Sequence, residues 1–336
     1  MNGEISASEL REGDVLLYCG TAWISRLIQR LDGTAVSHAS LFLGKNQAGE
    51  EIVGEALMGE GLVEKPLDQS VFGAEWVCVR RRPPDALVMG PVLRRARWYL
   101  DQGDRYAYEQ ILLLAIICLT RKVPLKPSFG VFLRAVVERA TAFLRRLRAG
   151  GQDREPMICS EFAYRCYDEA TPPPNAPYHL EIEWAATFEP AAALAGAGID
   201  PQSVLAQLRA HPDPLEVFND VKSALAARGR TAVADRAADL PLEALAKQYL
   251  AELDDAKAPE GELALEPVVG PVQNLALRIR DSDLFGARER CGAAGLDSTS
   301  PLFDQFFTTV ADFVTPGDLL RTPSLEDKGV VYRAPG

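Results

Sequence analysis

Three residues in the first half of the chain carry the side chains of a thiol-based catalytic site. Cys159 occurs in the segment ICSEF, His38 opens the run HASLFL, and Glu55 interrupts the apolar run IVGEAL. A thiolate is a strong nucleophile, an imidazole accepts and returns its proton, and a carboxylate orients the imidazole. Together these residue types predict acyl-transfer chemistry at a carbonyl carbon.

Cys159 follows a loop and stands at the start of a helix that is expected over Ile158–Asp168. Free backbone N–H groups and the helix dipole stabilise a thiolate at this position, which lowers the pKa of the thiol. The alternative is an inert core thiol, because cysteine is among the most frequently buried residue types. Cys166, seven residues further along the same helical face, is interpreted as such a core residue.

His38 and Glu55 also have structural alternatives. A histidine at the edge of a sheet often makes only structural hydrogen bonds, and a glutamate on an edge strand can point to solvent. A carboxylate within an apolar run is costly to bury alone, so Glu55 must be paired or face a cleft if it is buried. If the strands containing His38 and Glu55 are adjacent, the carboxylate reaches the imidazole.

Signals for other kinds of site are missing from the sequence. The three histidines, His38, His179 and His211, form no HExxH motif and no cluster with cysteines, so neither a metal nor a cofactor is expected. There is no phosphate-binding GxxxxGK[ST] loop, no strand-linked GxGxxG and no GxSxG motif. The six cysteines show no CxxC spacing and are expected to be reduced thiols.

The composition is that of a soluble globular chain. It has 336 residues, of which 47% are hydrophobic and 25% charged, and this length can bury a full core without disulfide or metal crosslinks. The net charge of −11 argues against nucleic acid as a partner. Residues 1–150 carry 20 basic and 17 acidic side chains, whereas residues 151–336 carry 16 basic and 30 acidic ones.

The sequence shows no signal peptide and no membrane-spanning segment. The first residues are polar and acidic, and the longest apolar run, 111–119, has nine residues. A helix that crosses a bilayer needs about 20 apolar residues. We therefore expect a cytoplasmic location.

Hydrophobic periodicity predicts a mostly antiparallel sheet followed by helices. Strands are expected at Asp14–Tyr18, His38–Leu43, Ile52–Leu57 and Trp76–Arg80. Helices are expected at Thr21–Leu31, Val92–Leu100, Tyr108–Leu119, Phe129–Leu147 and Ile158–Asp168. Residues 185–255 are rich in Ala and Leu and are expected to be helical, and the Pro- and Gly-containing stretch 258–271 is interpreted as a linker.

The order of these motifs resembles that of the circularly permuted papain-like enzymes. These form the YiiX/YaeF-like branch of the NlpC-type cysteine hydrolase superfamily, which is related to lecithin:retinol acyltransferase. The similar segments are GDVLLY, SHASLFLG, GEAL, YAYEQ and ICSEF, within residues 10–170. In the permuted branch the histidine strand precedes the cysteine helix, as His38 precedes Cys159 here. The acyltransferase relatives carry an NCEHF-type motif instead of ICSEF, which disfavours lipid acyl transfer.

The resemblance implies an α+β, permuted papain-like fold, in which a small antiparallel sheet packs on helices and a helical region is appended. It implies that Cys159 is the nucleophile, that His38 is the base and that Glu55 orients the imidazole. It also suggests a tyrosine near the site at Tyr106 or Tyr108, although a tyrosine that caps a core helix explains these residues equally well.

Three parts of the chain are expected on this basis. They are a catalytic domain over 1–180 with a helical insertion near 120–155, a helical cap or accessory region over 181–258, and a linker with a C-terminal segment over 259–336. The C-terminal segment is expected to return to the catalytic domain through its PGDLL motif.

The implied activity is that of a cysteine-dependent amidase or peptidase, which cleaves a peptide, amide or acyl-ester substrate through a thioester. Two alternatives remain open: a lipid acyltransferase or thioesterase on the same fold, and a non-catalytic binding or scaffold protein that uses the helical region. The basic helix 129–148 permits peripheral contact with a membrane or a protein, although such charges more often form a solvated helix face. The sequence carries no signal of the oligomeric state.

Overall fold

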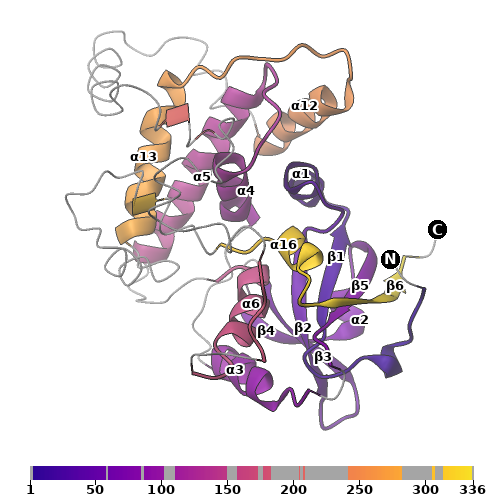
Figure 1. The fold of residues 1–336 in the computed structure, drawn as a ribbon. Coiled ribbons are helices and arrows are strands. Elements are labelled where there is room, and N and C mark those ends of the chain that lie inside the picture. The colour runs from indigo at the N-terminus through magenta and orange to yellow at the C-terminus, as the bar shows by residue number, and fades with distance from the viewer. Residues whose placement is uncertain are drawn as a thin grey trace. The chain divides into compact units, whose positions relative to one another are not determined.

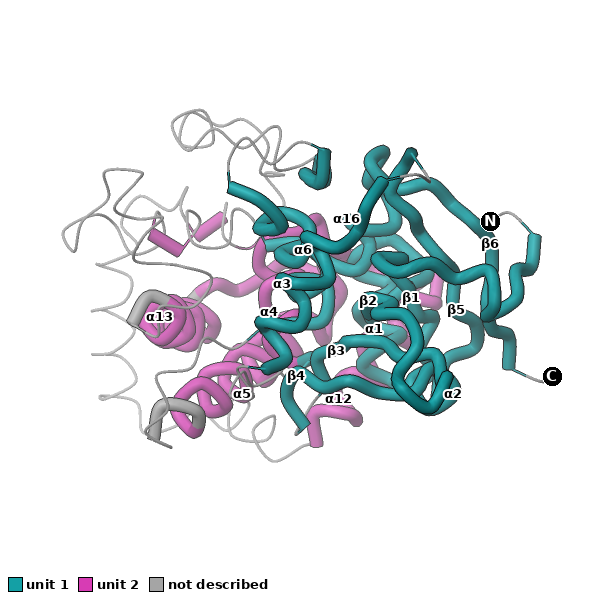
Figure 2. The backbone as a smooth tube through the Cα atoms, turned by 90° about the horizontal axis from the view of Figure 1, so that it is seen from below, with its two compact units in different colours: residues 1–110, 154–187, 312–336 teal, residues 111–153, 188–311 magenta. Residues whose placement is uncertain are grey.

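A computed structural model shows a mixed α+β protein with one six-stranded sheet (Figure 1). The structure describes residues 3–57, 60–84, 87–101, 110–149, 157–172, 177–182, 204, 207–208, 241–281, 305–306 and 313–334. The chain forms two compact units (Figure 2): unit 1 comprises residues 1–110, 154–187 and 312–336, and unit 2 comprises residues 111–153 and 188–311. Cys159, His38 and Glu55 all belong to unit 1.

Unit 1 contains the sheet, whose strand order is β4-β3-β2-β1-β5-β6 with every neighbouring pair antiparallel. The strands are β1 (Val15–Gly20), β2 (His38–Lys45), β3 (Glu51–Leu57), β4 (Gly61–Pro66), β5 (Ala74–Arg81) and β6 (Glu326–Arg333). The predicted α+β class and antiparallel sheet are therefore confirmed.

Alternation of side chains along the strands divides the interior of unit 1 into two cores. The helices are α1 (Trp23–Asp32), α2 (Leu67–Ser70), α3 (Gly90–Asp101), α6 (Cys159–Asp168) and α16 (Pro316–Arg321), and a short 3-10 helix covers Ala7–Glu9. On one face of the sheet, Phe162 and Ala163 of α6 join the cluster that contains Leu41 and Leu43 of β2. On the other face, Phe42 of β2 packs in the cluster that contains Leu67 of α2. Helix α6 is thereby held against the sheet at the strand that begins with the candidate histidine.

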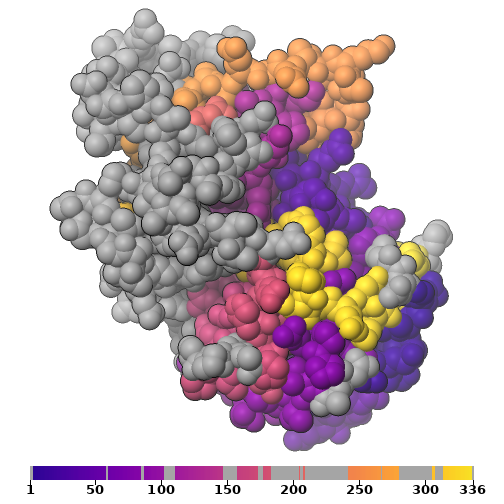
Figure 3. Space-filling model, viewed as in Figure 1, coloured from indigo at the N-terminus to yellow at the C-terminus, as the bar shows by residue number. Residues whose placement is uncertain are grey.

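The sequence pattern does not predict two edge strands, β4 and β6. Their sequences, GLVEKP and EDKGVVYR, are polar and alternate weakly. β4 pairs with β3 directly before it in the chain, whereas β6 pairs with β5 across most of the sequence. The returning PGDLL segment is a helix, α16, because Thr315 and Asp318 form a capping box around Pro316 in the first turn. The strand that returns to the sheet is β6, which follows α16, and Figure 3 shows this C-terminal segment in yellow at the surface beside α6.

Unit 2 is helical in the residues described. Its helices are α4 (Gln110–Thr120), α5 (Phe129–Ala149), α12 (Leu242–Asp254) and α13 (Glu266–Asp281). Helix α5 packs against α12 and α13, and the ring of Tyr249 on α12 lies 5.3 Å from the ring of Phe129 and 5.1 Å from that of Phe132. No helix among the described residues has the length and apolar character to cross a membrane.

The stretch 258–271, interpreted from the sequence as a linker, is helical from Glu266 onward. Pro267 lies in the first turn of α13, where the missing N–H of a proline costs nothing, and Val268 and Val269 are buried. Helix α12 falls within the region 185–255 that is expected to be helical, and most of the remainder of that region lies outside the described residues.

Candidate active site

His38 and Glu55 lie on adjacent antiparallel strands and form a hydrogen-bonded pair. The register places Ser40 of β2 opposite Glu55 of β3, and His38, two residues before Ser40, lies on the same face. His38 Nε2 is 2.8 Å from Glu55 Oε2, and the Glu55 side chain is only 1% exposed. Because β3 is an interior strand, the alternative of an edge glutamate facing solvent does not apply.

Cys159 is the first residue of α6, with Ile158 as the N-cap. The apolar face of α6 is buried against β2 and β3, which brings the start of the helix to the start of β2. The Cys159 sulfur lies close enough to the His38 side chain and to the backbone N–H groups of Ala39 and Ser160 for all three to lower the pKa of its thiol. The structure thus brings Cys159, His38 and Glu55 together from α6, β2 and β3.

The surroundings of Cys159 and His38 favour the charged form of both side chains. Burial raises the pKa of the Cys159 thiol, but the neighbouring His38 outweighs burial and holds that pKa below its ordinary value. Burial likewise opposes charge on His38, but the Cys159 sulfur and the Glu55 carboxylate raise the pKa of the imidazole to about 10. At a pH between the pKa of Cys159 and the pKa of His38, the pair consists of a thiolate and an imidazolium.

The second oxygen of Glu55 supports the same distribution of charge. Oε1 is buried and makes no hydrogen bond with any described residue. A buried carboxylate with one hydrogen bond is costly unless a cation lies beside it. The imidazolium form of His38 supplies that cation at 2.8 Å.

The other cysteines have different surroundings. All five described cysteines are free thiols, and Cys291 lies outside the described residues. Burial raises the pKa of Cys78 to about 12 and also raises the pKa of Cys118. Cys166 is fully buried in the core between α6 and the sheet, as its position on the helix predicts. Of Cys19, Cys78, Cys118 and Cys159, only Cys159 has a lowered pKa.

The sequence does not predict a group of hydroxyls that lies next to His38. Tyr18 lies opposite His38 in the β1–β2 register, and its hydroxyl is 2.7 Å from Ser40 Oγ and 2.8 Å from Ser70 Oγ. Alternation in DVLLY places Tyr18 on one face of a strand. The residue opposite it is set by the register, which the sequence does not reveal because helix α1 connects the two strands.

The remaining expected residues lie elsewhere. Tyr106 and Tyr108 fall outside the described residues. His179 is exposed and lies 3.0 Å from Asp168 on the surface, and His211 falls outside the described residues. In the part of the chain that the structure describes, no group of three or more His, Cys, Asp and Glu side chains is placed to hold a metal ion.

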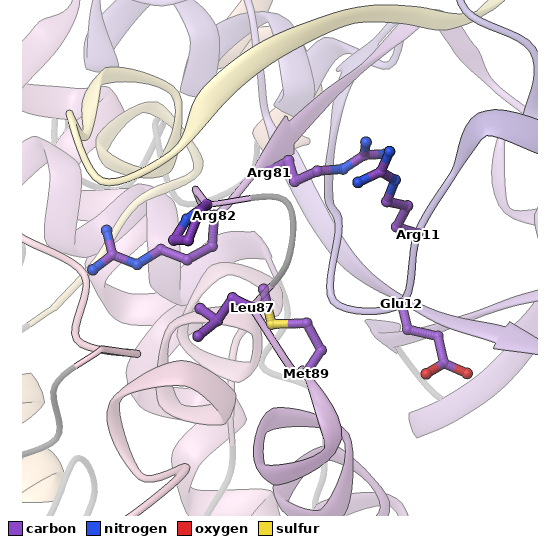
Figure 4. A pocket seen from close by; sticks show the side chains of 7 residues that line it. Arg11, Glu12, Arg81, Arg82, Leu87 and Met89 are labelled. Carbon is purple, nitrogen blue, oxygen red and sulfur yellow. The ribbon is translucent and has the colours of Figure 1, made fainter.

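A pocket of about 350 Å³ lies at the other end of the sheet (Figure 4). Its lining includes Arg81, the last residue of β5, whereas Tyr18 beside His38 pairs with Val77 of that strand. Four strand residues separate Arg81 from Val77, which corresponds to about 13 Å. Arg81 binds Asp14, and Arg82 donates to the carbonyls of Pro177 and Ser324, so these arginines hold the fold together.

The grouping of Cys159, His38 and Glu55 has the elements of nucleophilic catalysis. A thiolate attacks an electrophilic carbon, an adjacent imidazolium returns a proton to the leaving group, and a carboxylate holds the imidazole in place. The same groups alone would also form a buried charge network, and the chemistry therefore has to be measured.

Comparison with known proteins gives a remote structural likeness. No protein-family model matches the sequence, and no curated protein matches it. Among solved structures, the chain is similar to the metalloprotein yiiX from Escherichia coli O157:H7, at 18% sequence identity and a TM-score of 0.32. The match covers 58% of this chain and 91% of that protein.

Proposed function

We propose that the protein is a cysteine-dependent amidase or peptidase with a permuted papain-like, NlpC-type arrangement. Cys159 is the nucleophile, His38 is the general acid and base, and Glu55 orients the imidazole. One observation carries the proposal: a thiol at the start of a helix lies beside a histidine, which is itself paired with a buried carboxylate. The order of the histidine strand before the cysteine helix is that of the permuted enzymes.

In the first step the Cys159 thiolate attacks the substrate carbonyl and forms a carbon–sulfur bond. The His38 imidazolium then donates its proton to the departing amine as the carbon–nitrogen bond breaks, which leaves a thioester and a neutral imidazole. Neutral His38 takes a proton from water as the water oxygen attacks the thioester. The carbon–sulfur bond breaks, the acid leaves, and the thiolate and imidazolium are restored.

The negative charge that develops on the carbonyl oxygen needs a donor. The backbone N–H of Cys159, in the first turn of α6, has no partner within the helix and is the donor that we assign. Such a donor lowers the barrier by about 3–4 kcal/mol. Glu55 keeps the imidazole oriented throughout, because its hydrogen bond to Nε2 leaves Nδ1 as the ring nitrogen for the thiol.

The test is the alkylation rate of each cysteine against pH, followed by mass spectrometry with iodoacetamide. We expect Cys159 to react first and at a pH below the ordinary thiol range, and His38→Ala to remove this behaviour. His179→Ala is the matched control, because His179 also pairs with a carboxylate but lies on the surface. If Cys159 in the unmodified protein reacts as slowly as Cys118, or if His38→Ala leaves its rate unchanged, the proposal is wrong.

A second experiment identifies the acyl group. The protein is incubated with a panel of peptide amides and fatty-acyl thioesters, and the intact mass is recorded with Cys159→Ser as the control. Hydroxylamine cleaves a thioester and yields a hydroxamate of the transferred acyl group. A peptidyl hydroxamate supports the amidase, and a fatty-acyl one supports the acyltransferase or thioesterase alternative. An inert Cys159 in the alkylation experiment favours a scaffold protein.

A further inference from the structure

We propose that Tyr18 is a positioning residue for His38, and this inference rests on the proposed function. The two residues face each other across β1 and β2, and their ring centroids are 5.1 Å apart with an interplanar angle of 61°. This is the edge-to-face geometry that aromatic pairs prefer, and it stabilises a particular orientation of both rings. Tyr18 is 3% exposed, so the contact is shielded from water.

The Tyr18 ring is itself fixed by its hydroxyl. That oxygen is 2.7 Å from Ser40 Oγ and 2.8 Å from Ser70 Oγ, and a phenol can donate one hydrogen bond while accepting another. The two serines come from β2 and α2, so two elements other than its own strand hold the ring. The two hydrogen bonds hold the position of the side chain, because a movement of Tyr18 away from His38 would break both of them.

His38 needs such a contact because its other restraint is incomplete. The hydrogen bond from Nε2 to Glu55 fixes one atom of the imidazole but leaves rotation about that bond. The Tyr18 ring limits this rotation and thereby keeps the opposite ring nitrogen directed at Cys159. Ser40 also lies opposite Glu55 in the β2–β3 register. The same serine therefore neighbours both side chains that restrain His38, namely Tyr18 and Glu55.

Tyr18 does not touch the reacting atoms in this proposal. Its effect is therefore measured through the protonation of Cys159 and His38. Tyr18→Leu removes the ring contact, and we expect the midpoint of Cys159 alkylation to move toward the ordinary thiol pKa. A rise of one unit lowers the alkylation rate at acidic pH about tenfold. Tyr18→Phe keeps the ring and loses the hydroxyl, and we expect it to restore most of the rate.

The matched controls are Tyr178→Leu and Tyr178→Phe. Tyr178 is another buried tyrosine of unit 1, and its hydroxyl donates to the carbonyl of Val88 at 2.7 Å. A loss of packing alone would affect both tyrosine positions, whereas the proposal predicts a shifted alkylation profile only for Tyr18→Leu. The midpoint of the His38 imidazole, followed by NMR, is expected to fall in the same variant.

The outcomes separate this inference from the proposed function. If His38→Ala changes Cys159 alkylation and a folded Tyr18→Leu does not, the positioning role is wrong and the proposed function stands. If His38→Ala has no effect, the proposed function fails first. Should Tyr18→Leu fail to fold, Tyr18→Met removes the ring and replaces it with a flexible apolar side chain. Its alkylation midpoint must then rise relative to the unmodified protein, and an unchanged midpoint overturns the inference.

Discussion

Glu55 binds His38 with one oxygen and leaves the other without a hydrogen bond among the described residues. Oε2 lies 2.8 Å from His38 Nε2, and Oε1 is buried. The carboxylate therefore depends on the charge of a single histidine for its compensation. The state of His38 is in turn coupled to Cys159, so the three side chains respond to any change as one unit.

Glu55→Gln tests this coupling with little change of shape. Loss of the carboxylate charge lowers the pKa of His38 and weakens the thiolate of Cys159, because the imidazolium is no longer compensated. We expect alkylation of Cys159 at pH 6 to slow by about tenfold or more, since each pKa unit is a factor of ten. Glu51→Gln on the same strand is the control, as Glu51 pairs with Lys45 near the surface. Equal rates in both variants would contradict the coupling.

The stability of the protein depends on pH through the same pair. The pKa of His38 rises from its ordinary 6.5 to about 10 on folding, so its contribution is fully present below pH 6.5 and is lost as the pH rises through about 10. The pKa of Cys159 falls from its ordinary 9.0, so its contribution is present above pH 9 and is lost as the pH falls through the lowered value. Above pH 9 the Cys159 contribution no longer changes, so the combined contribution falls there with the loss of the His38 proton.

Urea unfolding from pH 7 to pH 10.5 measures this dependence. We expect the free energy of unfolding to fall between pH 9 and 10.5 by more in the unmodified protein than in His38→Gln, because only the former has an imidazolium to lose. Groups whose pKa does not depend on His38 cancel in the difference. Parallel curves for the two proteins would show that His38 is not charged in the folded state.

A different carboxylate, Asp14, is expected to determine stability and not reactivity. It is fully buried, and its oxygens accept two hydrogen bonds of 2.6 Å from the Arg81 guanidinium. Asp14→Asn leaves the buried guanidinium without this charge, which costs about 3–5 kcal/mol. Chemical denaturation measures the loss, and Cys159 alkylation below the denaturation midpoint should remain unchanged.

The surface pair of Arg134 and Glu138 provides the comparison for Asp14. Both side chains are partly exposed, and the pair spans one turn of α5. Glu138→Gln is expected to lower the free energy of unfolding by less than about 1 kcal/mol. A loss at Glu138 as large as that at Asp14 would contradict the role of burial.

Gly54 sets the distance between β3 and α6. A Cβ at this position would lie 3.1 Å from Phe162 Cζ and 3.2 Å from Leu43 Cδ1, closer than ordinary contact. Gly54→Ala therefore pushes α6 away from the sheet, and we expect a loss of about 1–3 kcal/mol in the free energy of unfolding and slower alkylation of Cys159. Gly270→Ala on α13, where no atom lies within 4 Å of the new Cβ, should cause no loss. A fully stable Gly54→Ala would show that the helix tolerates the shift.

Local pattern was sufficient to locate most of the elements that carry the candidate site. Strong apolar runs define β1, β2, β3 and β5, because these strands are buried and their periodicity is a property of consecutive residues. Cys159 at a predicted helix start is likewise a local property. The sequence pattern does not predict the edge strands β4 and β6, because both are polar and alternate weakly, and β6 in addition pairs with a strand far away in sequence.

The sequence by itself determined the chemical types available to this protein: a thiol at a helix start, an imidazole at a strand start and a carboxylate within an apolar run. Only the tertiary structure decided that they meet, because the β2–β3 register and the packing of α6 on the sheet arise from contacts between distant segments. The same holds for Tyr18. Its type and strand are visible in the sequence, whereas its position opposite His38 is a property of the register alone.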